Sequence, residues 1–424
     1  MNRERLAKVM TESLAPSSPN YQSAREAVAN LPADIAESLF LHDVSKLIEE
    51  ALLTESPFKG GQGYLVARDN GYSGFYAHEA AIALTRRFLR DQSPQPGIGW
   101  LEKVLATEEG HGFGVMALWG VEVNTPVAFS NGVSLVPFGA LPDSNIKAWI
   151  LRPKDPSVYP GFLGSIFAFA PRAALICPHM VKPFFHPTAL GEPPAQPNPL
   201  HVYHLLDDCR QAISLVGPSC PISAGYWFQF DDADLNEASF YGGVTTSHME
   251  VLPWGFTPPK PLDPAETREV VDRFLALGEP LRGKLRLALE RLNQALRRRP
   301  SGDKALDLSI ALEILLVDGS GENTHKVGLR AALLLDVLLE ERLQARSIIG
   351  GLYILRSALV HDGILPPDVK LVRFGKRPSG QVIEDATVIC GKVIRSILFR
   401  GEIPDWYYFE LNAFSSSTSK FQGG

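Results

Sequence analysis

The stretch that decides the C-terminal fold is Leu352-Tyr353-Ile354-Leu355-Arg356-Ser357-Ala358-Leu359-Val360-His361. Around it, over residues 341–360, apolar side chains recur at spacings of four, three and four, which is the period of one helix face. The members of this stripe are Ile348, Leu352, Leu355 and Leu359. The spacing therefore predicts a helix over residues 341–360 that packs this stripe into a core.

Polar side chains of the same helix point away from this stripe. Ser357 and His361 are four residues apart, so they share a face, and at about 100° per residue that face lies nearly opposite the stripe. Arg356 lies at its flank. A histidine of the core would lie on the stripe, so we expect His361 at the surface. It stands at the helix C-terminus, before Asp362-Gly363, where the helix dipole favours a protonated imidazole.

More helices are expected in this third of the chain. The helical period predicts them near residues 264–277, 281–298, 303–317, 324–339 and 381–399. The segments between them are rich in glycine and proline, which end helices. Short connections between such helices predict a compact antiparallel bundle over residues 265–400.

Three of these segments resemble the HEPN superfamily, and most closely its Apea-like branch. The superfamily signature is an arginine, four further residues and a histidine at a helix end, which Arg356 and His361 match. The branch usually has glycine directly after the histidine, where this chain has Asp362. The resemblance lies in DLSIALEILL at residues 307–316, THKVGLRAALLL at 324–335 and LYILRSALVH at 352–361.

The resemblance implies a metal-independent endoribonuclease without a cofactor, and the residue types suit that chemistry. RNA is cut when a 2′-hydroxyl attacks the neighbouring phosphate. His361 could take that proton or donate one to the leaving oxygen, because histidine titrates near neutral pH. The forked donors of Arg356 could stabilise charge on the phosphorus, and Ser357 could orient the phosphate. We therefore predict that these three residues are catalytic.

Glu313 is predicted to support this site. Its helix is apolar nearly all round, which indicates burial, and a buried carboxylate needs a partner. The candidate partners are Arg356 and Arg330. The resemblance favours a role in holding Arg356, and an ion pair unrelated to catalysis is the alternative.

The charge of the chain is unevenly distributed, and this suggests RNA as a partner. The net charge is −6, whereas residues 281–400 carry 20 Lys and Arg against 13 Asp and Glu. Such a basic region points to a polyanion, although basic faces are often only solvated surface. The predicted RNA-binding residues are Lys326, Arg330, Arg297, Arg298 and Arg299.

The whole chain is predicted to be an α+β multidomain protein. Its 424 residues are too many for one ordinary core, and 45% hydrophobic residues exclude a disordered or fibrous chain. Residues 1–110 are expected to be mainly helical. Residues 111–260 are expected to be a β-rich or mixed module with a hairpin turn at Asn131-Gly132, a second strand-like block over 226–251 and a proline-rich loop at 178–199. Residues 401–424 are expected to be a tail.

No metal site, disulfide framework or membrane segment is expected. His201, His204, Cys209 and Cys220 have spacings that fit no standard zinc pattern, and a helix with one face in the core explains them better. The acidic run Asp231-Asp232-Ala233-Asp234 is expected to be a turn. The chain starts with no secretory signal and its longest apolar stretch is too short to span a bilayer, so we expect a cytoplasmic protein.

The sequence thus predicts an endoribonuclease with an N-terminal sensing or regulatory module. Resemblance to the Apea-like branch suggests a toxic stress or antiviral, anti-phage effector. Two copies meeting through the HEPN helices would place two histidines across one groove, so a homodimer is expected. An unidentified trigger would bind the N-terminal region. The alternatives are a non-catalytic HEPN scaffold for dimerisation or nucleotide binding, and an unrecognised N-terminal enzyme that the HEPN part regulates.

Overall fold

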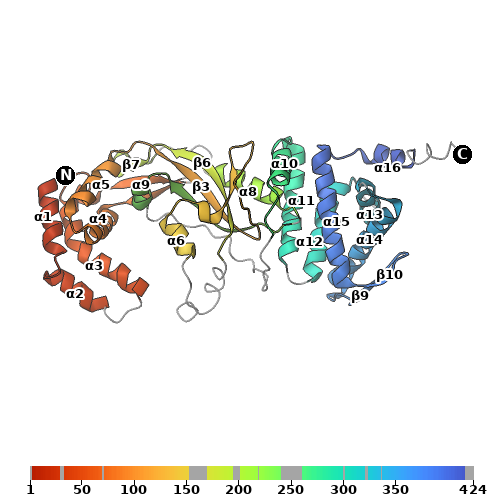
Figure 1. The fold of residues 1–424 in the computed structure, drawn as a ribbon, viewed down its shortest axis with the longest axis horizontal. Helices are drawn as coiled ribbons and strands as arrows, with labels where there is room; N and C mark the ends of the chain where they lie inside the picture. The colour runs from red at the N-terminus through yellow and green to blue at the C-terminus, as the bar shows by residue number, and fades with distance from the viewer. Residues whose placement is uncertain are drawn as a thin grey trace.

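The protein is an elongated α+β molecule with helices at both ends and an antiparallel sheet between them (Figure 1). The N-terminal helices and the C-terminal bundle lie at opposite ends of the long axis. The computed structural model describes residues 2–28, 33–68, 71–151, 170–193, 201–217, 219–239, 260–298, 301–319, 323–335 and 337–415.

The N-terminal part is mainly helical, as predicted, and also contains an unpredicted hairpin. Its elements are α1 (Arg3–Ser13), α2 (Pro19–Val28), α3 (Ala33–Leu53), η1 (Lys59–Gly61), β1 (Tyr64–Arg68), β2 (Gly71–Phe75), α4 (Ala77–Asp91) and α5 (Pro94–Leu105). On α4 the apolar residues Ala77, Ala81, Leu84 and Phe88 recur at helical spacing and are buried. This part therefore has its own apolar core.

A five-stranded antiparallel sheet forms the middle of the molecule, in the order β4-β5-β6-β3-β8. The elements of this region are β3 (Gly110–Trp119), β4 (Val127–Ala128), β5 (Ser134–Pro137), η2 (Phe138–Ala140), α6 (Asn145–Leu151), β6 (Ala173–Val181), β7 (Phe185–Pro187), η3 (Thr188–Leu190), α8 (His201–Ile213), β8 (Ile222–Phe230) and α9 (Ala233–Ala238). The predicted turn at Asn131-Gly132 joins β4 to β5, and Gly132 has a φ of 84°.

The proline-rich span 178–199 is not only a loop, as was predicted. It contains the end of β6, and β7 then pairs with β1 in the N-terminal part. Phe184 and Phe185 are buried in the N-terminal core, so this span connects two parts of the molecule. The prediction of a second strand-like block over residues 226–251 was also only partly right, because residues 233–238 form α9 after β8 ends at Phe230. Residues 194–199 and 240–251 lie outside the described part.

The C-terminal region is a helical bundle that matches the predicted helices in order and number. They are α10 (Pro264–Leu275), α11 (Glu279–Arg297), α12 (Ser301–Leu316), α13 (Asn323–Leu334), α14 (Leu339–Asp362) and α15 (Ser379–Arg400). The clearest difference is α13, which ends five residues before the predicted boundary. The backbone N–H of Leu338 donates to the side chain of Glu341, 3.1 Å away, and this cap begins α14 early.

The bundle region is not purely helical, which corrects the all-α prediction. Residues 362–380 were predicted as a break but contain an antiparallel hairpin of β9 (Asp368–Leu371) and β10 (Gly375–Pro378) that packs on α14. The predicted tail contains α16 (Trp406–Ser415), whose Trp406 is buried. Both elements are short, so their period was too brief to recognise in the sequence.

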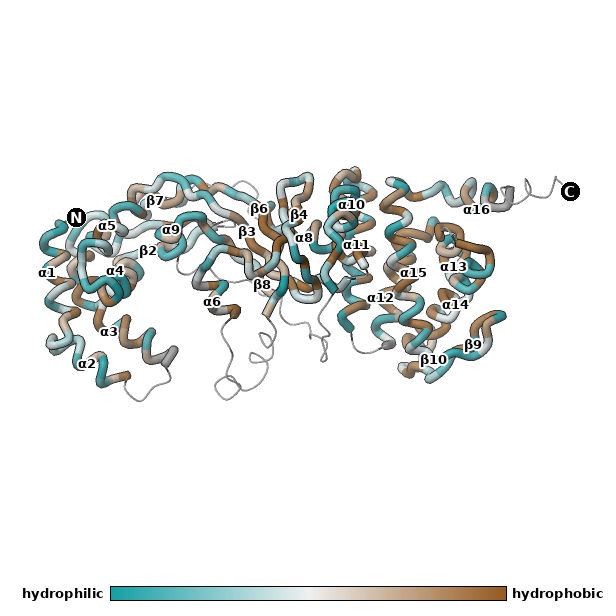
Figure 2. Tube along the Cα trace, viewed as in Figure 1, coloured by the Kyte–Doolittle hydropathy of each residue, from teal (hydrophilic) through white to brown (hydrophobic). Residues whose placement is uncertain are grey.

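One apolar core continues from the sheet into the bundle. One face of the sheet contributes residues such as Met116 and Leu175, and these belong to the same buried cluster as Phe274 of α10 and Leu312 of α12. Figure 2 shows apolar segments in β3 and β4 of the sheet and again along α15. The middle and C-terminal parts therefore share their interior.

An ion pair between α8 and α11 strengthens this connection. Both oxygens of Asp208 accept hydrogen bonds from Arg286, from Nε at 2.7 Å and from Nη2 at 2.9 Å. Asp208 is buried. We expect Arg286→Ala to lower the free energy of unfolding by about 3 kcal/mol, because a buried carboxylate loses its partner. Chemical denaturation measures this change.

The control is Lys8→Ala, which removes an exposed partner of Glu12 and is expected to cost less than about 0.5 kcal/mol. Equal effects of the two substitutions would contradict the structural role of the Arg286 pair.

Candidate functional site

The end of α14 exposes two of the three predicted catalytic side chains. Ser357 and His361 are exposed, whereas the predicted core residues Ile348, Leu352 and Leu355 are buried. Leu359 is half-buried. The helix stops in a left-handed Gly363, with φ 67°, whose N–H bonds to the carbonyl of Leu359 at 3.0 Å. This end of α14 therefore presents Ser357 and His361 to solvent at its last two turns.

Arg356 is held in place by the neighbouring helix α12. Its Nη1 lies 3.2 Å from Oε1 of Glu313, and the Tyr353 hydroxyl donates to the same oxygen at 3.0 Å. The guanidinium also lies over the Tyr353 ring, with its carbon 5.7 Å from the ring centre. Of the two partners predicted for Glu313, the structure selects Arg356.

Glu313 and its partner Arg356 are less buried than predicted. The Glu313 side chain keeps 24% of its surface exposed and that of Arg356 keeps 34%, so the pair lies at the rim of the bundle and is not enclosed. Tyr353 is buried. Burial, and then the charge of Glu313, raise the pKa of the Tyr353 hydroxyl, so it remains protonated and continues to donate. Glu313 and Tyr353 therefore fix the position of Arg356.

Arg330 does not belong to an RNA-binding surface, contrary to the prediction. It is 4% exposed, and its guanidinium bonds to Asp318 at 2.5 Å and to Glu410 at 2.6 Å. It also lies 4.9 Å from the ring centre of Trp406. These contacts hold α16 against α13. They give the basic residue at position 330 a structural role. Lys326 is directed to the same Asp318, 3.9 Å away.

The arginines at the end of α11 also have structural partners. Arg298 contacts the buried carboxylate of Asp307 at 2.6 Å, and Asp303 at 3.3 Å. Arg297 donates to the backbone carbonyl of Asn293 at 3.3 Å. Arg299 lies outside the described residues. The burial of Asp307 accounts for Arg298, because a buried charge requires an opposite one.

Other basic residues, which the sequence analysis passed over, gather beside α14. A cavity of about 620 Å³ is lined by His325, Arg346, Lys370 and Arg373, from α13, α14 and the β9–β10 hairpin. Helical periodicity could not bring these four residues together, because Lys370 and Arg373 lie on the β9–β10 hairpin, which was not predicted from the sequence. The signal present in the sequence was the basic composition of residues 370–377.

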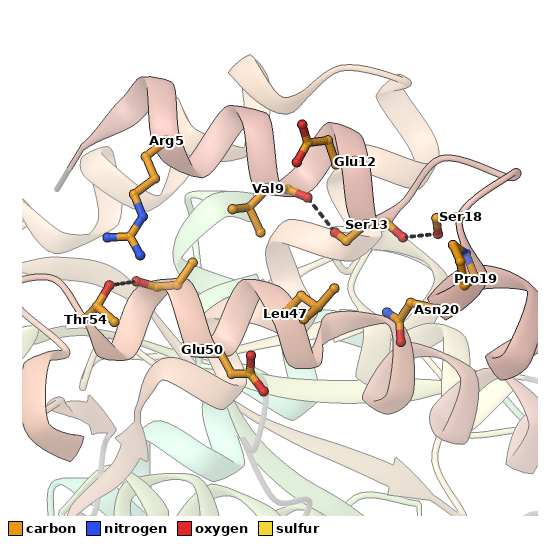
Figure 3. Close-up of a pocket in the computed structure, with 11 residues that line it drawn as sticks. Arg5, Val9, Glu12, Ser13, Ser18, Pro19, Asn20, Leu47, Glu50 and Thr54 are labelled. Atoms are coloured by element: carbon orange, nitrogen blue, oxygen red, sulfur yellow. Dashed lines mark hydrogen bonds between the residues drawn. The ribbon is translucent and has the colours of Figure 1, made fainter.

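A second cavity lies at the other end of the molecule, between α1, α2 and α3. Figure 3 shows Val9 and Leu47 facing one another across it, with Arg5 at one end and Asn20 at the other. Its volume is about 610 Å³. The hydroxyls of Ser13, Ser18 and Thr54 donate to backbone carbonyls. Its lining therefore combines apolar surface with charges of both signs, from Arg5, Glu12 and Glu50.

The residues considered for metal binding do not come together. Cys209 is buried, where burial raises the pKa of its thiol, while His201 and His204 are exposed on the same helix. The acidic run caps and anchors α9: Asp232 accepts from the N–H of Asp234, and Asp234 pairs with Lys103. In the described ranges no three His, Cys, Asp or Glu side chains could hold a metal ion.

No protein-family model, curated protein or solved structure matches the chain. Within the described residues, no helix combines the length and the apolar composition that crossing a membrane requires.

The Glu313 contacts lead to a stability prediction. We expect Glu313→Ala to lower the free energy of unfolding by roughly 1–3 kcal/mol, because both Tyr353 and Arg356 lose their acceptor. Glu313→Gln should cost less, since its amide oxygen still accepts from Tyr353. Thermal melting of the three proteins provides the measurement.

The matched control is Glu340→Ala on the exposed first turn of α14, which is expected to stay within about 0.5 kcal/mol of wild type. A Glu313→Ala protein that melts with the wild type would show that this contact does not order Arg356.

Proposed function

We propose that this protein is a HEPN-type endoribonuclease that cuts RNA through the 2′-hydroxyl, with Arg356, Ser357 and His361 as its catalytic residues. The observation that carries the proposal is the end of α14. There Glu313 and Tyr353 fix Arg356 at the rim of the bundle, while Ser357 and His361 are exposed within the next five residues of the helix. A cation held next to an exposed proton carrier suits phosphodiester cleavage.

The proposed reaction needs a base, an acid and positive charge at the phosphate. The 2′-oxygen forms a bond to phosphorus, its proton passes to a His361 imidazole, and the bond from phosphorus to the 5′-oxygen breaks. That leaving oxygen takes a proton from a protonated imidazole. Arg356 keeps guanidinium donors that Glu313 does not use, and these stabilise the negative charge that grows on the phosphoryl oxygens.

A homodimer supplies both proton carriers at once. Base and acid act on opposite sides of phosphorus, and one chain offers a single His361 at this site. Exposed apolar side chains border the motif: Val360 and Ile364 keep 59% and 70% of their surface exposed. Apolar surface of this kind favours association, and a two-fold axis lets one patch serve both copies.

We propose that the protein is a cytoplasmic stress or anti-phage effector and that its N-terminal part regulates the nuclease. This part has its own core, and its cavity between α1 and α3 offers room for a small or extended trigger. Because the sheet shares its interior with the bundle, a change in the N-terminal part can reach the bundle through packed side chains. Growth arrest on expression, absent with His361→Ala, would support toxicity as the output.

The catalytic prediction concerns His361→Ala and Arg356→Ala. Each should abolish cleavage of labelled RNA while the protein stays folded. His361 is exposed, so its truncation should cost about 0.5 kcal/mol, and the half-buried Arg356 somewhat more. Cleavage is measured on purified full-length protein, with and without a chelator.

His204→Ala on α8 serves as the control for loss of an exposed histidine outside the motif, and it should retain cleavage chemistry. Undiminished cleavage by His361→Ala would exclude the catalytic role, and cleavage that stops on chelation would exclude a metal-free reaction.

The dimer prediction concerns mass and activity together. Wild-type protein should scatter light as a species of twice 46.4 kDa, and its specific activity should fall on dilution. Val360→Glu should give a monomer without cleavage, because it places a charge in the apolar border. Leu287→Glu makes the same change on exposed α11 and should remain a dimer. A wild-type monomer with activity unaffected by dilution would contradict the shared site.

A further inference from the structure

The basic cavity beside α14 has a composition that suits an anion. Its volume is about 620 Å³, and its basic side chains are His325, Arg346, Lys370 and Arg373. None of the described residues that line it is acidic. These groups come from three separate elements, so tertiary packing and not one basic run of sequence brings them together.

The basic groups of this cavity lack the partners that cations have elsewhere in the chain. Across the described ranges, Arg346, Lys370 and Arg373 form no ion pair with a carboxylate, whereas their neighbours Lys376 and Arg377 pair with Asp368 and Asp385. The one contact within the group joins Nη2 of Arg346 to Nδ1 of His325 at 3.4 Å. Unpaired cations that converge on a cavity favour a negatively charged ligand.

The hairpin that carries Lys370 and Arg373 is fixed against α14. The hydroxyl of Ser347 donates to the carbonyl of Val372 at 2.8 Å. Gly351 allows the close approach, because a Cβ there would lie 2.5 Å from Cδ2 of Leu371. Arg373 has a φ of 68°, a conformation that costs stability in a residue other than glycine. The hairpin turn is thus held in a strained form beside the cavity.

The cavity and the candidate active site lie along one face of α14. Arg346, Gly350, Ile354, Ser357 and His361 follow one another on α14 at spacings of four, four, three and four, which is one face of the helix. At a rise of about 1.5 Å per residue, Gly350 and Ser357 are separated by about 10 Å along the axis. An extended ligand can therefore lie along this face and reach both places.

We infer that this cavity binds the backbone phosphates of single-stranded RNA next to the bond that is cut. This inference rests on the proposed function, because it takes RNA as the substrate. The exposed Ile354 and Val372 add apolar surface beside the cations, which suits bases as well as phosphates. A chain of nucleotides uses the whole face, whereas a small anion would use the cavity alone.

The experiment measures binding of a labelled single-stranded RNA to the full-length chain over a range of salt concentrations. All proteins carry His361→Ala, so that the RNA stays intact. The test variant adds Arg346→Glu and Lys370→Glu. Its matched control adds Lys284→Glu and Lys392→Glu, which reverse two exposed lysines on α11 and α15 that have no carboxylate partner in the described part.

We expect the test variant to bind RNA at least roughly tenfold more weakly than the control, since each lost charged contact is worth about that factor. The slope of log Kd against log salt should fall by about 1.4, because two phosphate contacts on a single strand are lost. Equal losses in the test and control variants, or none, would overturn the inference. So would binding of adenosine monophosphate that is lost in the test variant while RNA binding is unchanged.

A second variant closes the cavity without changing charge. A Cβ at Gly350 meets no atom within 4 Å, so Gly350→Leu fills open space and leaves the core intact. It should weaken RNA binding in the same direction. If wild-type protein binds RNA through this cavity but does not cut it, the proposed function fails, whereas the assignment of the cavity as a site for RNA phosphates stands. If wild-type protein cuts RNA and neither variant alters binding or cleavage, the inference alone fails.

Discussion

Helix α12 is apolar on almost every side, and the C-terminal fold follows from the need to enclose it. It contacts α11, α13, α14 and α15, and Leu308, Leu312 and Leu315 are all buried. A helix without a polar face cannot lie on a surface, so neighbouring helices must cover most of it. The direction of α14, and with it the place of the motif, depends on this requirement.

The same requirement explains the position of Glu313. It is carried by the enclosed α12, yet it lies at the rim where α14 ends, so its charge is only partly removed from water. A half-buried carboxylate is best stabilised by nearby donors, and Tyr353 and Arg356 provide them. The interaction that stabilises the packing of α12 against α14 thus also orients the arginine of the candidate active site.

Basic residues in this bundle fall into two groups with different roles. Those of the first group pair with carboxylates: Arg298 with the buried Asp307, and Arg330, itself buried, with Asp318. Those around the cavity on α14 have no such partners in the described residues, although the chain as a whole is acidic. Net charge therefore says little about where an anion binds, because pairing decides which cations remain available.

The sequence by itself determined the helices of the bundle, the buried stripe of Ile348, Leu352 and Leu355 and the exposure of His361, since these follow from local periodicity. Tertiary structure alone decided which cations are paired, because Arg330 meets Glu410 from 80 residues away. It also decided the core shared by sheet and bundle and the hairpin that completes the basic cavity. Periodicity reports which way a side chain leaves its own helix, whereas a partner distant in sequence depends on how the whole chain packs.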